Sequence, residues 1–485
     1  MASTTQKDEY VQLKLLVNEE TNKVVFAEAE KDFVDILCSF LTLPLGTIAR
    51  LSQMDSSMGP VKIGCLNSLY QSVAGLDECL CTETNKEMLL YPRNSSEDYC
   101  GTLKLNIDDV EPTEYFMSAN KHCGSESDCE CDYFPANIHG KCGRCSSCCN
   151  CPVFLRPFYK GFVNSIATFV ITDDLIIMPN SMVHTSFSLL QNSGIATSSA
   201  KEMTVNVTKE KVLDLLKCAL VSLSPLTDVF LGKKPSIQRY LFSAGTFKNN
   251  RYIQSILQLV IRKSDGKILF AHAEQDFADL LVSFLTFPLG GVVSNLRGYG
   301  SIGSVGELYK SIFKLDIRKY LMTKEAKMRL VHPHLSSEFK LSKNILPIKT
   351  ERRHFYCYYQ GESYKKSIIN DQFFVTDEYR SDEKKCETID LIKGNSLKRS
   401  ASDEGYLKGP RTYLVTDELV IGPSSSSISA LLLINRLQVP LEDLKEKIVT
   451  IGVKECFSIL EAALTTTSAL TNGLNHLLTK VKEEK

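Results

Sequence analysis

Two stretches of this chain, taken together, decide its fold. They are KVVFAEAEKDFVDILCSFLTLPLG at Lys23–Gly46 and KILFAHAEQDFADLLVSFLTFPLG at Lys267–Gly290. The stretches are identical at 16 of 24 positions and lie 244 residues apart, and the same spacing relates TDDL at Thr172–Leu175 to TDEL at Thr416–Leu419. A unit of about 240 residues is too long for a solenoid repeat and has the size of a domain. The sequence therefore predicts a tandem duplication of one domain.

The periodicity within this block predicts a hairpin followed by a helix. Gln12–Val17 and Val24–Ala27 are apolar, β-branched runs separated by a polar segment, which is typical of two antiparallel strands. Apolar residues then recur at helical spacing, at Phe33, Ile36, Leu37, Phe40 and Leu41. Pro44 and Gly46 end or bend this helix.

The remainder of each unit mixes helices and strands. In the first unit we expect a helix near Leu66–Val73, strands near Ile166–Ile171 and Leu175–Met178 with a tight turn between them, and a closing helix at Lys209–Leu223. Because strands and helices do not alternate regularly, the expected class is α+β, with two tandem related domains. The predicted boundaries are residues 1–232 for the first repeat, 233–251 for a basic and small-polar linker, and 252–485 for the second repeat.

Composition and charge are those of an ordinary soluble protein. Of 485 residues, 43% are hydrophobic and 23% charged, and the formal net charge of −1 gives no general attraction to nucleic acid or anionic membranes. The N-terminal residues lack the pattern of a signal peptide, and the longest uncharged run, Leu280–Leu296, is interrupted by Pro288 and shorter than a membrane span. We therefore expect a cytoplasmic or nuclear protein whose thiols are reduced.

A cysteine-rich insert, predicted at residues 122–151, contains the run CGRCSSCCNC at Cys142–Cys151. The spacing Cys142-x2-Cys145 is that of a zinc knuckle, in which two thiolates bind one tetrahedral ion. Cys129 and Cys131 supply the other pair, so the predicted ligands are Cys129, Cys131, Cys142 and Cys145. Four further cysteines are spare candidates: Cys123, Cys148, Cys149 and Cys151. The ligand set stays open, as do the number of ions and the alternatives of redox-active thiols or disulfides.

The second repeat has no such cluster. Its corresponding stretch, residues 333–416, contains only Cys357 and Cys386, so if both repeats fold alike the repeat core does not need the metal. A polar loop at residues 380–411 takes the place of the cysteines there, and Ser400 and Ser402 in it are candidate phosphorylation sites. Any zinc is thus expected to be structural and to stabilise the first insert alone.

Paired carboxylates are the strongest candidates for acid–base chemistry. Asp32 and Asp35 lie three residues apart at the start of the first predicted helix, and Asp276 and Asp279 repeat the pattern. Acidic residues in a first helical turn also stabilise the helix dipole, and we favour this structural interpretation. The pair Asp173-Asp174 and its counterpart Asp417-Glu418 are interpreted as hairpin turns.

Other catalytic signatures are weak or absent. Gly298–Gly303 matches G-x-G-x-x-G, but it follows a helical segment where a nucleotide site needs a strand, so we interpret it as a loop. The sequence contains no Walker A motif, no H-E-x-x-H and no G-x-S-x-G. These observations argue against an enzyme.

The chain resembles a plant protein family known as domain of unknown function 674. The resemblance rests on the block FAEAEKDFVD, the SFLTLPLG that follows it, the Cys-x-x-Cys knuckle and the TDDL segment, and it covers nearly the whole chain in tandem. It implies a plant source and a metal knuckle in the first repeat. The run Ser146–Cys151 is richer in cysteine than the family pattern. The family brings no established activity with it.

Three functions are compatible with these features. We expect first a protein-interaction or adaptor protein in which a structural zinc knuckle presents a binding surface to a protein partner. The second alternative is an enzyme with acids such as Asp32 and Asp276 in a cleft between the repeats. The third is a weak nucleic-acid binder that uses the basic residues of the knuckle, Lys141, Arg144, Arg156 and Lys160.

Overall fold

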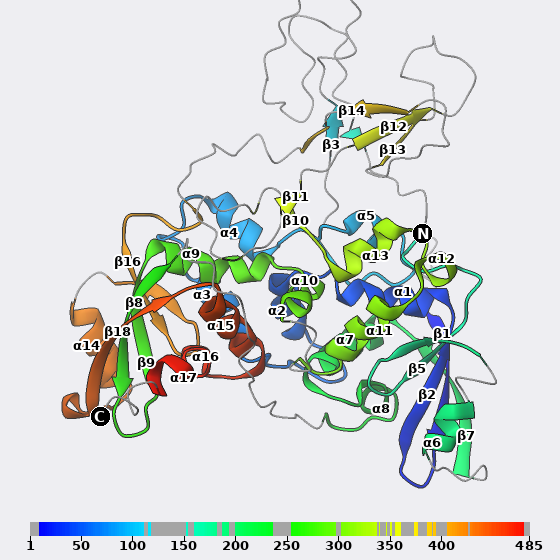
Figure 1. Ribbon diagram of the computed structural model, residues 1–485, viewed down its shortest axis with the longest axis horizontal. Coiled ribbons are helices and arrows are strands. Elements are labelled where there is room, and N and C mark those ends of the chain that lie inside the picture. Colours follow the sequence, from blue (N-terminus) through cyan, green and yellow to red (C-terminus); the bar gives the residue numbers. More distant parts are fainter. Residues whose placement is uncertain are drawn as a thin grey trace, which may run out of the picture.

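Two five-stranded antiparallel sheets stand at opposite ends of the molecule, and helices fill the space between them (Figure 1). This computed structural model describes residues 9–110, 115–117, 152–153, 160–181, 187–193, 199–235, 254–296, 302–336, 339, 346, 350–351, 355–359, 373–376, 386–389, 391–393, 405–424 and 427–479. Of the predicted linker, residues 236–251 lie outside these ranges.

The two large sheets have the same topology. The first has the order β6-β5-β2-β1-β7 and the second the order β17-β16-β9-β8-β18. Their strands are β1 (Val11–Asn18), β2 (Lys23–Ala29), β5 (Phe169–Thr172), β6 (Ile177–Pro179), β7 (Ala200–Val207), β8 (Ser255–Arg262), β9 (Ile268–Glu274), β16 (Thr412–Thr416), β17 (Ile421–Pro423) and β18 (Leu444–Ile451). Even the register shift between Leu16 and Val17 in the first hairpin recurs between Val260 and Ile261 in the second. The halves share one topology, while the duplication itself stays a prediction.

Helices occupy much of the rest of the described chain. The first half contributes α1 (Lys31–Phe40), α2 (Leu45–Ser52), α3 (Leu66–Ala74), α4 (Glu83–Leu90), α5 (Glu97–Cys100), α6 (Phe187–Ser193), α7 (Lys209–Val221) and α8 (Pro225–Phe230). The second half contributes α9 (Gln275–Ser283), η4 (Phe284–Thr286), α10 (Leu289–Asn295), α11 (Val305–Lys314), α12 (Ile317–Tyr320), α13 (Lys324–Val331), α14 (Ser427–Arg436), η7 (Leu441–Asp443), α15 (Val453–Thr465), α16 (Ala469–Gly473) and α17 (Asn475–Thr479). The predicted α+β class is confirmed. None of the described helices is long and apolar enough to cross a membrane.

The predicted hairpin is present as β1 and β2. Along β1, Leu13 and Leu15 are buried while the residues before each of them are exposed, which is the alternation expected of a strand with one covered face. The turn begins at Asn18, whose side-chain oxygen accepts hydrogen bonds from the N–H groups of Glu20 at 2.9 Å and Thr21 at 3.2 Å. This local bonding supports the reversal of the chain.

Burial of the first helices extends beyond the predicted apolar stripe. Every residue from Phe33 to Phe40 of α1 is buried, and so is every residue from Phe277 to Ser283 of α9. The stripe predicted only one covered face. In the structure α9 packs against β9 and β16 of its own sheet and also against α3 of the first half, so both sides are covered.

Two element boundaries differ from the sequence prediction. The strand expected to include Ile166 begins at Phe169, and the Ile166 side chain is 89% exposed. Helix α7 ends at Val221 and not at Leu223, because the chain turns there into α8, which begins at Pro225.

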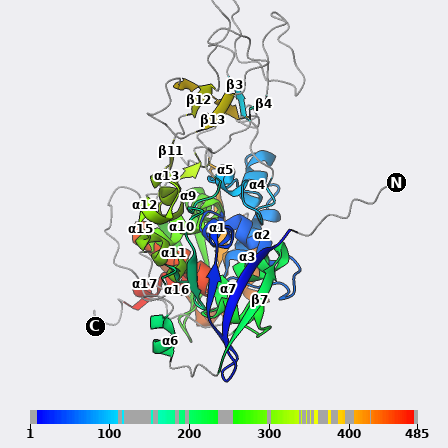
Figure 2. The same cartoon turned by 90° about the vertical axis from the view of Figure 1, so that its right-hand side faces the viewer.

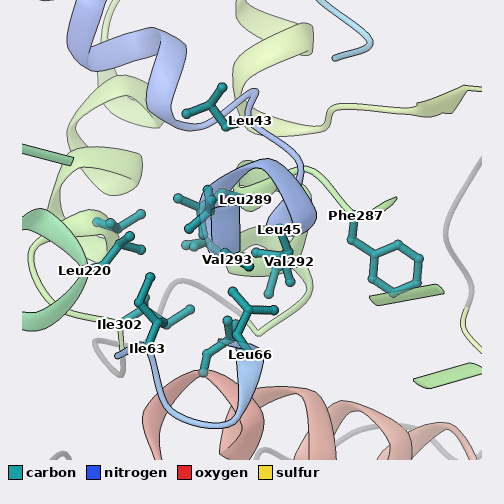
Figure 3. Close-up of a cluster of buried hydrophobic side chains, with 14 of the residues drawn as sticks. Leu43, Leu45, Ile63, Leu66, Leu220, Phe287, Leu289, Val292, Val293 and Ile302 are labelled. Carbon is teal, nitrogen blue, oxygen red and sulfur yellow. The ribbon is translucent and has the colours of Figure 1, made fainter. Parts of the chain in front are cut away.

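The two halves meet at a pair of prolines. Pro44 and Pro288 face each other in an antiparallel bridge. Since proline has no N–H, the following residues carry the hydrogen bonds: Leu45 donates to the carbonyl of Phe287, and Leu289 donates to that of Leu43, both at 2.9 Å. Buried apolar side chains of both halves form a cluster (Figure 3) that includes Leu43, Leu45, Ile63, Leu66, Leu220, Phe287, Leu289, Val292, Val293 and Ile302. One hydrophobic core therefore runs through both halves.

Beyond this centre, each half places a helix on the sheet of the other. Helix α3 contacts β17, where the Ser72 hydroxyl accepts from the Ile421 N–H at 2.8 Å and donates to the Ile421 carbonyl at 3.0 Å. In the same way, α11 of the second half contacts β6 of the first. Other segments of the two halves also pair, because Leu80 forms a β-bridge with Leu407 and Val163 forms one with Leu321. Each sheet thus depends on helices from the other half.

Candidate functional site

We use the name first insert for residues 111–159, which contain the predicted cysteine-rich insert 122–151, and the chain that follows it contacts a buried carboxylate. The backbone N–H groups of Phe162 and Val163 both donate to one oxygen of Asp35 on α1, at 2.8 and 2.9 Å. The other oxygen accepts from the ammonium of Lys31 at 2.6 Å, and the same ammonium donates to the carbonyl of Val163 at 2.7 Å. Asp35 and Lys31 together fix to α1 the residues that directly follow the insert.

The chain that follows the second insert, residues 340–404, is fixed by the corresponding residues of α9. The N–H groups of Tyr406 and Leu407 donate to one oxygen of Asp279 at 3.0 and 2.8 Å. Gln275 replaces the lysine, and its amide donates to the carbonyl of Leu407 at 2.7 Å and to the second oxygen of Asp279 at 3.3 Å. The geometry is the same in both halves, although the first site contains a charged donor and the second a neutral one.

A glycine lies against each of these carboxylates. Gly161 has φ +71° and Gly405 has φ +82°, which are conformations that side chains of L-residues disfavour. A Cβ atom at Gly161 would lie 2.0 Å from an oxygen of Asp35, and one at Gly405 would lie 2.0 Å from an oxygen of Asp279. Only glycine therefore allows the chain to pass this close to the carboxylate.

Burial changes the proton affinity of both carboxylates. It raises the pKa of Asp35 to about 6, against the opposing effect of Lys31, and raises the pKa of Asp279 to about 7. The structure separates each predicted pair, because Asp32 is exposed and Asp276 is half-exposed. Asp35 and Asp279 are thus engaged with backbone donors, which agrees with a structural role.

The predicted Asp173-Asp174 turn also contains a structural carboxylate. Asp173 accepts from the N–H of Thr227 at 2.8 Å and from its hydroxyl at 2.6 Å. Asp417 repeats this arrangement with Thr471, at 2.8 and 3.0 Å. Burial raises the pKa of both aspartates. Asp173 thus connects its turn to α8, and Asp417 connects its turn to α16.

The two inserts share a small sheet. Strand β3 (Tyr115–Met117) pairs with β4 (Pro152–Val153), and on its other side with β15 (Leu391–Lys393) of the second insert. Alongside, β12 (Phe355–Tyr359) pairs with β13 (Phe373–Thr376) and β14 (Cys386–Ile389), while β10 (Leu335–Ser336) pairs with β11 (Thr350–Glu351). We call β3, β4 and β12–β15 the head. Both views show its labelled strands above the helices of the core (Figures 1 and 2).

The cysteine-rich stretch lies between two paired strands of the head. Tyr115 is opposite Val153 and Phe116 is opposite Pro152, so the chain that leaves β3 returns at β4. The predicted ligands Cys129, Cys131, Cys142 and Cys145, and the spare candidates Cys123, Cys148, Cys149 and Cys151, all lie outside the described residues. So do Ser400 and Ser402 and most of Gly298–Gly303. Within the described ranges, no group of three or more His, Cys, Asp or Glu side chains is placed to hold a metal ion.

Comparison with known protein families identifies the chain. Residues 7–454 match the family described as Protein of unknown function (DUF674). The chain belongs to this family. No curated protein and no solved structure matches it. The resemblance inferred from the sequence blocks is confirmed, and the DUF674 match extends from before β1 to α15.

One buried charge in this DUF674 chain was not predicted. Lys217 of α7 is 0% exposed, and its ammonium donates to the carbonyl of Met54 at 2.6 Å, the hydroxyl of Ser56 at 2.7 Å and the carbonyl of Gly59 at 2.8 Å. Burial lowers the pKa of this lysine. The signal in the sequence was a lysine in the middle of the apolar run Val212–Val221. Lys217 holds the loop between α2 and α3 against α7.

A second unpredicted cation connects the halves near the head. Arg329 of α13 donates to the carbonyl of Ser95 at 2.7 Å and lies 3.6 Å from the carboxylate of Asp98. Its guanidinium also lies over the ring of Tyr99, 5.5 Å from the centroid, and this ring stacks on Phe162 at 5.1 Å. A cation from the second half thus supports the residues at the end of the first insert.

Proposed function

We propose that this protein is an interaction or adaptor protein whose recognition unit is the head. The observation that supports this proposal is the pairing of β15 with β3, because it joins segments of both inserts into one small sheet. Each insert is fixed where it returns to the core, by Asp35 in the first half and by Asp279 in the second. A rigid core that presents one joint head is an arrangement suited to binding a protein partner.

In this proposal a structural zinc ion orders the cysteine-rich loop of the head. Cys142 and Cys145 have the spacing of a knuckle, and Cys129 and Cys131 complete a four-thiolate set of the kind that tetrahedral zinc prefers. The loop would gain order from the metal, since zinc binding to such sites supplies about 10–16 kcal/mol at neutral pH. The zinc would have no catalytic task, because four cysteines leave no open coordination position.

An enzyme is the second candidate, and the pKa values of Asp35 and Asp279 are the observation that favours it. Carboxyl groups with pKa values of about 6 and 7 are suited to proton transfer at neutral pH. We rank this function lower because both carboxylates already accept two backbone hydrogen bonds, and perturbed pKa values also occur in structural networks.

The proposal is tested by cross-linking in an extract of cells from the protein's own organism. The proteins that cross-link to the wild-type chain are compared with those that cross-link to two head variants. One variant carries Cys142→Ser and Cys145→Ser, and the other replaces Leu391–Lys393 with Gly-Ser-Gly to remove β15. Cys81→Ser, at a half-buried cysteine of the core, is the control. The proposal expects the control to retain the partners of the wild type and both head variants to lose them. Partners that persist in both head variants would show that binding occurs elsewhere.

A further inference from the structure

Strand β18 forms the outer edge of the second sheet. It pairs with β8 on one side, and no described strand lies on the other. The Lys263 N–H donates to the carbonyl of Asp443 at 2.7 Å in the same register that joins β8 to β18. Because the direction of backbone groups alternates along a strand, Lys445, Lys447 and Val449 bond toward β8. Glu446, Ile448 and Thr450 then direct their N–H and C=O groups toward the open edge.

Two exposed isoleucines lie on one face of the sheet, beside this edge. The side chain of Ile448 is 71% exposed and that of Ile256 on β8 is 64% exposed. Ile256 is opposite Thr450 and Ile448 is opposite Gln258, so the two isoleucines are diagonal neighbours on one face. An open strand edge beside exposed apolar side chains favours pairing with another strand.

The corresponding edge of the first sheet lacks these features. Strand β7 occupies the position of β18, and its register with β1 places Thr204 and Gln12 where the second sheet has Ile448 and Ile256. All four side chains are exposed, but those on the first sheet are polar. The isoleucines are therefore not a requirement of the sheet itself, and only one of the two edges has an apolar surface.

We infer that β18 binds β18 of a second copy of this chain, antiparallel and centred on Ile448. This register places Ile448 opposite Ile448 of the other copy, and Glu446 opposite Thr450. Residues that face each other in these pairs all have edge-directed backbone groups, so each pair exchanges two hydrogen bonds. The two Ile256 side chains then extend the apolar contact on both sides, in a continuous ten-stranded sheet.

The charges of β18 favour this register over its neighbour. A pairing centred on Glu446 would place two Glu446 carboxylates opposite each other and Lys445 opposite Lys447, both of which are unfavourable. The register centred on Ile448 places Lys447 opposite Val449 and Lys445 opposite Ile451, without like charges in direct opposition. The register centred on Ile448 thus avoids the like-charge pairs that a register centred on Glu446 would create.

Sedimentation of the full chain tests this inference across about 1–100 µM, the range of ordinary dimer affinities. The wild type is expected to reach twice the chain mass of 54.2 kDa. Ile448→Pro removes an N–H that faces the open edge and does not bond β8, so the sheet is expected to persist while the dimer is lost. Thr204→Pro makes the same change on β7 and is expected to remain dimeric.

A second variant, Ile448→Lys, leaves the backbone intact and places two positive charges opposite each other. This variant is expected to be monomeric with unchanged circular dichroism. If the proline variant does not fold, Ile448→Lys alone tests whether β18 forms the dimer contact. A wild type that stays monomeric over the whole range overturns the inference. So does a dimer that survives Ile448→Lys, or one that Thr204→Pro abolishes, because the contact would then lie elsewhere.

Discussion

Pro44 and Pro288 face each other in an antiparallel bridge, and backbone hydrogen bonds join the two halves of the chain on both sides of this pair. The Leu45 N–H donates to the carbonyl of Phe287, and the Leu289 N–H donates to the carbonyl of Leu43. Each half therefore supplies an acceptor for a backbone N–H of the other. The buried cluster of Figure 3 draws its side chains from both halves. The two sheets are therefore parts of one cooperative structure.

The backbone hydrogen bonds and the shared core between the halves predict that neither half folds alone. Fragments of residues 1–235 and 254–485 would each expose the apolar side chains around Leu45 or Leu289, and exposed surface of this kind leads to aggregation. Each fragment is expected to be insoluble or to bind a hydrophobic dye when expressed separately. Co-expressed fragments are expected to purify together. A single fragment whose NMR spectrum shows the sharp, dispersed amide signals of a folded domain would show that this half does not need the other.

The raised pKa of Asp279 predicts a pH dependence of stability. Its ordinary pKa is 3.8 and its native pKa is about 7, so between these values the native state holds a proton that the unfolded chain releases. The free energy of unfolding therefore falls as pH rises through this window, by roughly 4 kcal/mol for such a shift. Asp279→Asn cannot ionise, so this component is lost, and the melting temperatures at pH 5 and pH 8 are expected to lie closer together.

Asp32→Asn is the control for this experiment, since it removes an exposed carboxylate from the start of α1. Its melting curve is expected to keep the pH dependence of the wild type. If Asp279→Asn also keeps the full difference between pH 5 and pH 8, then another group titrates in this window and the assignment to Asp279 is wrong.

The close contact between Gly161 and Asp35 predicts a large cost for a single methyl group. In Gly161→Ala the new Cβ would approach an oxygen of Asp35 to 2.0 Å, so the carboxylate or the end of the insert must move. Gly59→Ala is a matched control, because Gly59 has the same φ of +71° but no atom within 4 Å of the added Cβ. Chemical denaturation is expected to give a loss of about 1–2 kcal/mol for the control and at least twice that for Gly161→Ala. Equal losses would mean that only backbone strain matters.

Loss of the Lys217 ammonium is expected to loosen the loop between α2 and α3. In Lys217→Met the carbonyls of Met54 and Gly59 and the hydroxyl of Ser56 lose their donor, while the apolar volume is retained. The free energy of unfolding is expected to fall by about 2–4 kcal/mol, with faster amide exchange in residues 54–60. Lys209→Met, at an exposed position of the same helix, is expected to change neither quantity. Unchanged amide exchange in residues 54–60 of the Lys217→Met variant would show that the ammonium does not hold this loop.

The periodicity of the sequence predicted the local elements but not their partners. Alternation in Gln12–Val17 and the helical spacing from Phe33 to Leu41 indicated the hairpin and the helix, and both are present. A stripe of apolar residues says that a face is covered, but it does not say by which segment. The second covered face of α9 comes from α3, which lies some two hundred residues earlier in the chain, so local spacing could not reveal it.

The same limit applies to the candidate site. Asp32 and Asp35 both lie in the first turns of α1, and their spacing did not distinguish the exposed residue from the buried one. The donors that bind Asp35, the N–H groups of Phe162 and Val163, follow the first insert and are distant in the sequence. Lys217 was accessible to prediction, because a lysine within an apolar helical run needs buried acceptors.

We propose that a zinc ion orders the cysteine-rich loop of a head built from both inserts, and plasma mass spectrometry of the purified protein measures whether the metal is bound. The wild-type chain is expected to contain about one zinc ion, and the variant with Cys142→Ser and Cys145→Ser is expected to contain none while the core keeps its melting temperature. A wild-type protein that contains no metal and whose cysteines titrate as free thiols would show that no zinc ion orders this loop.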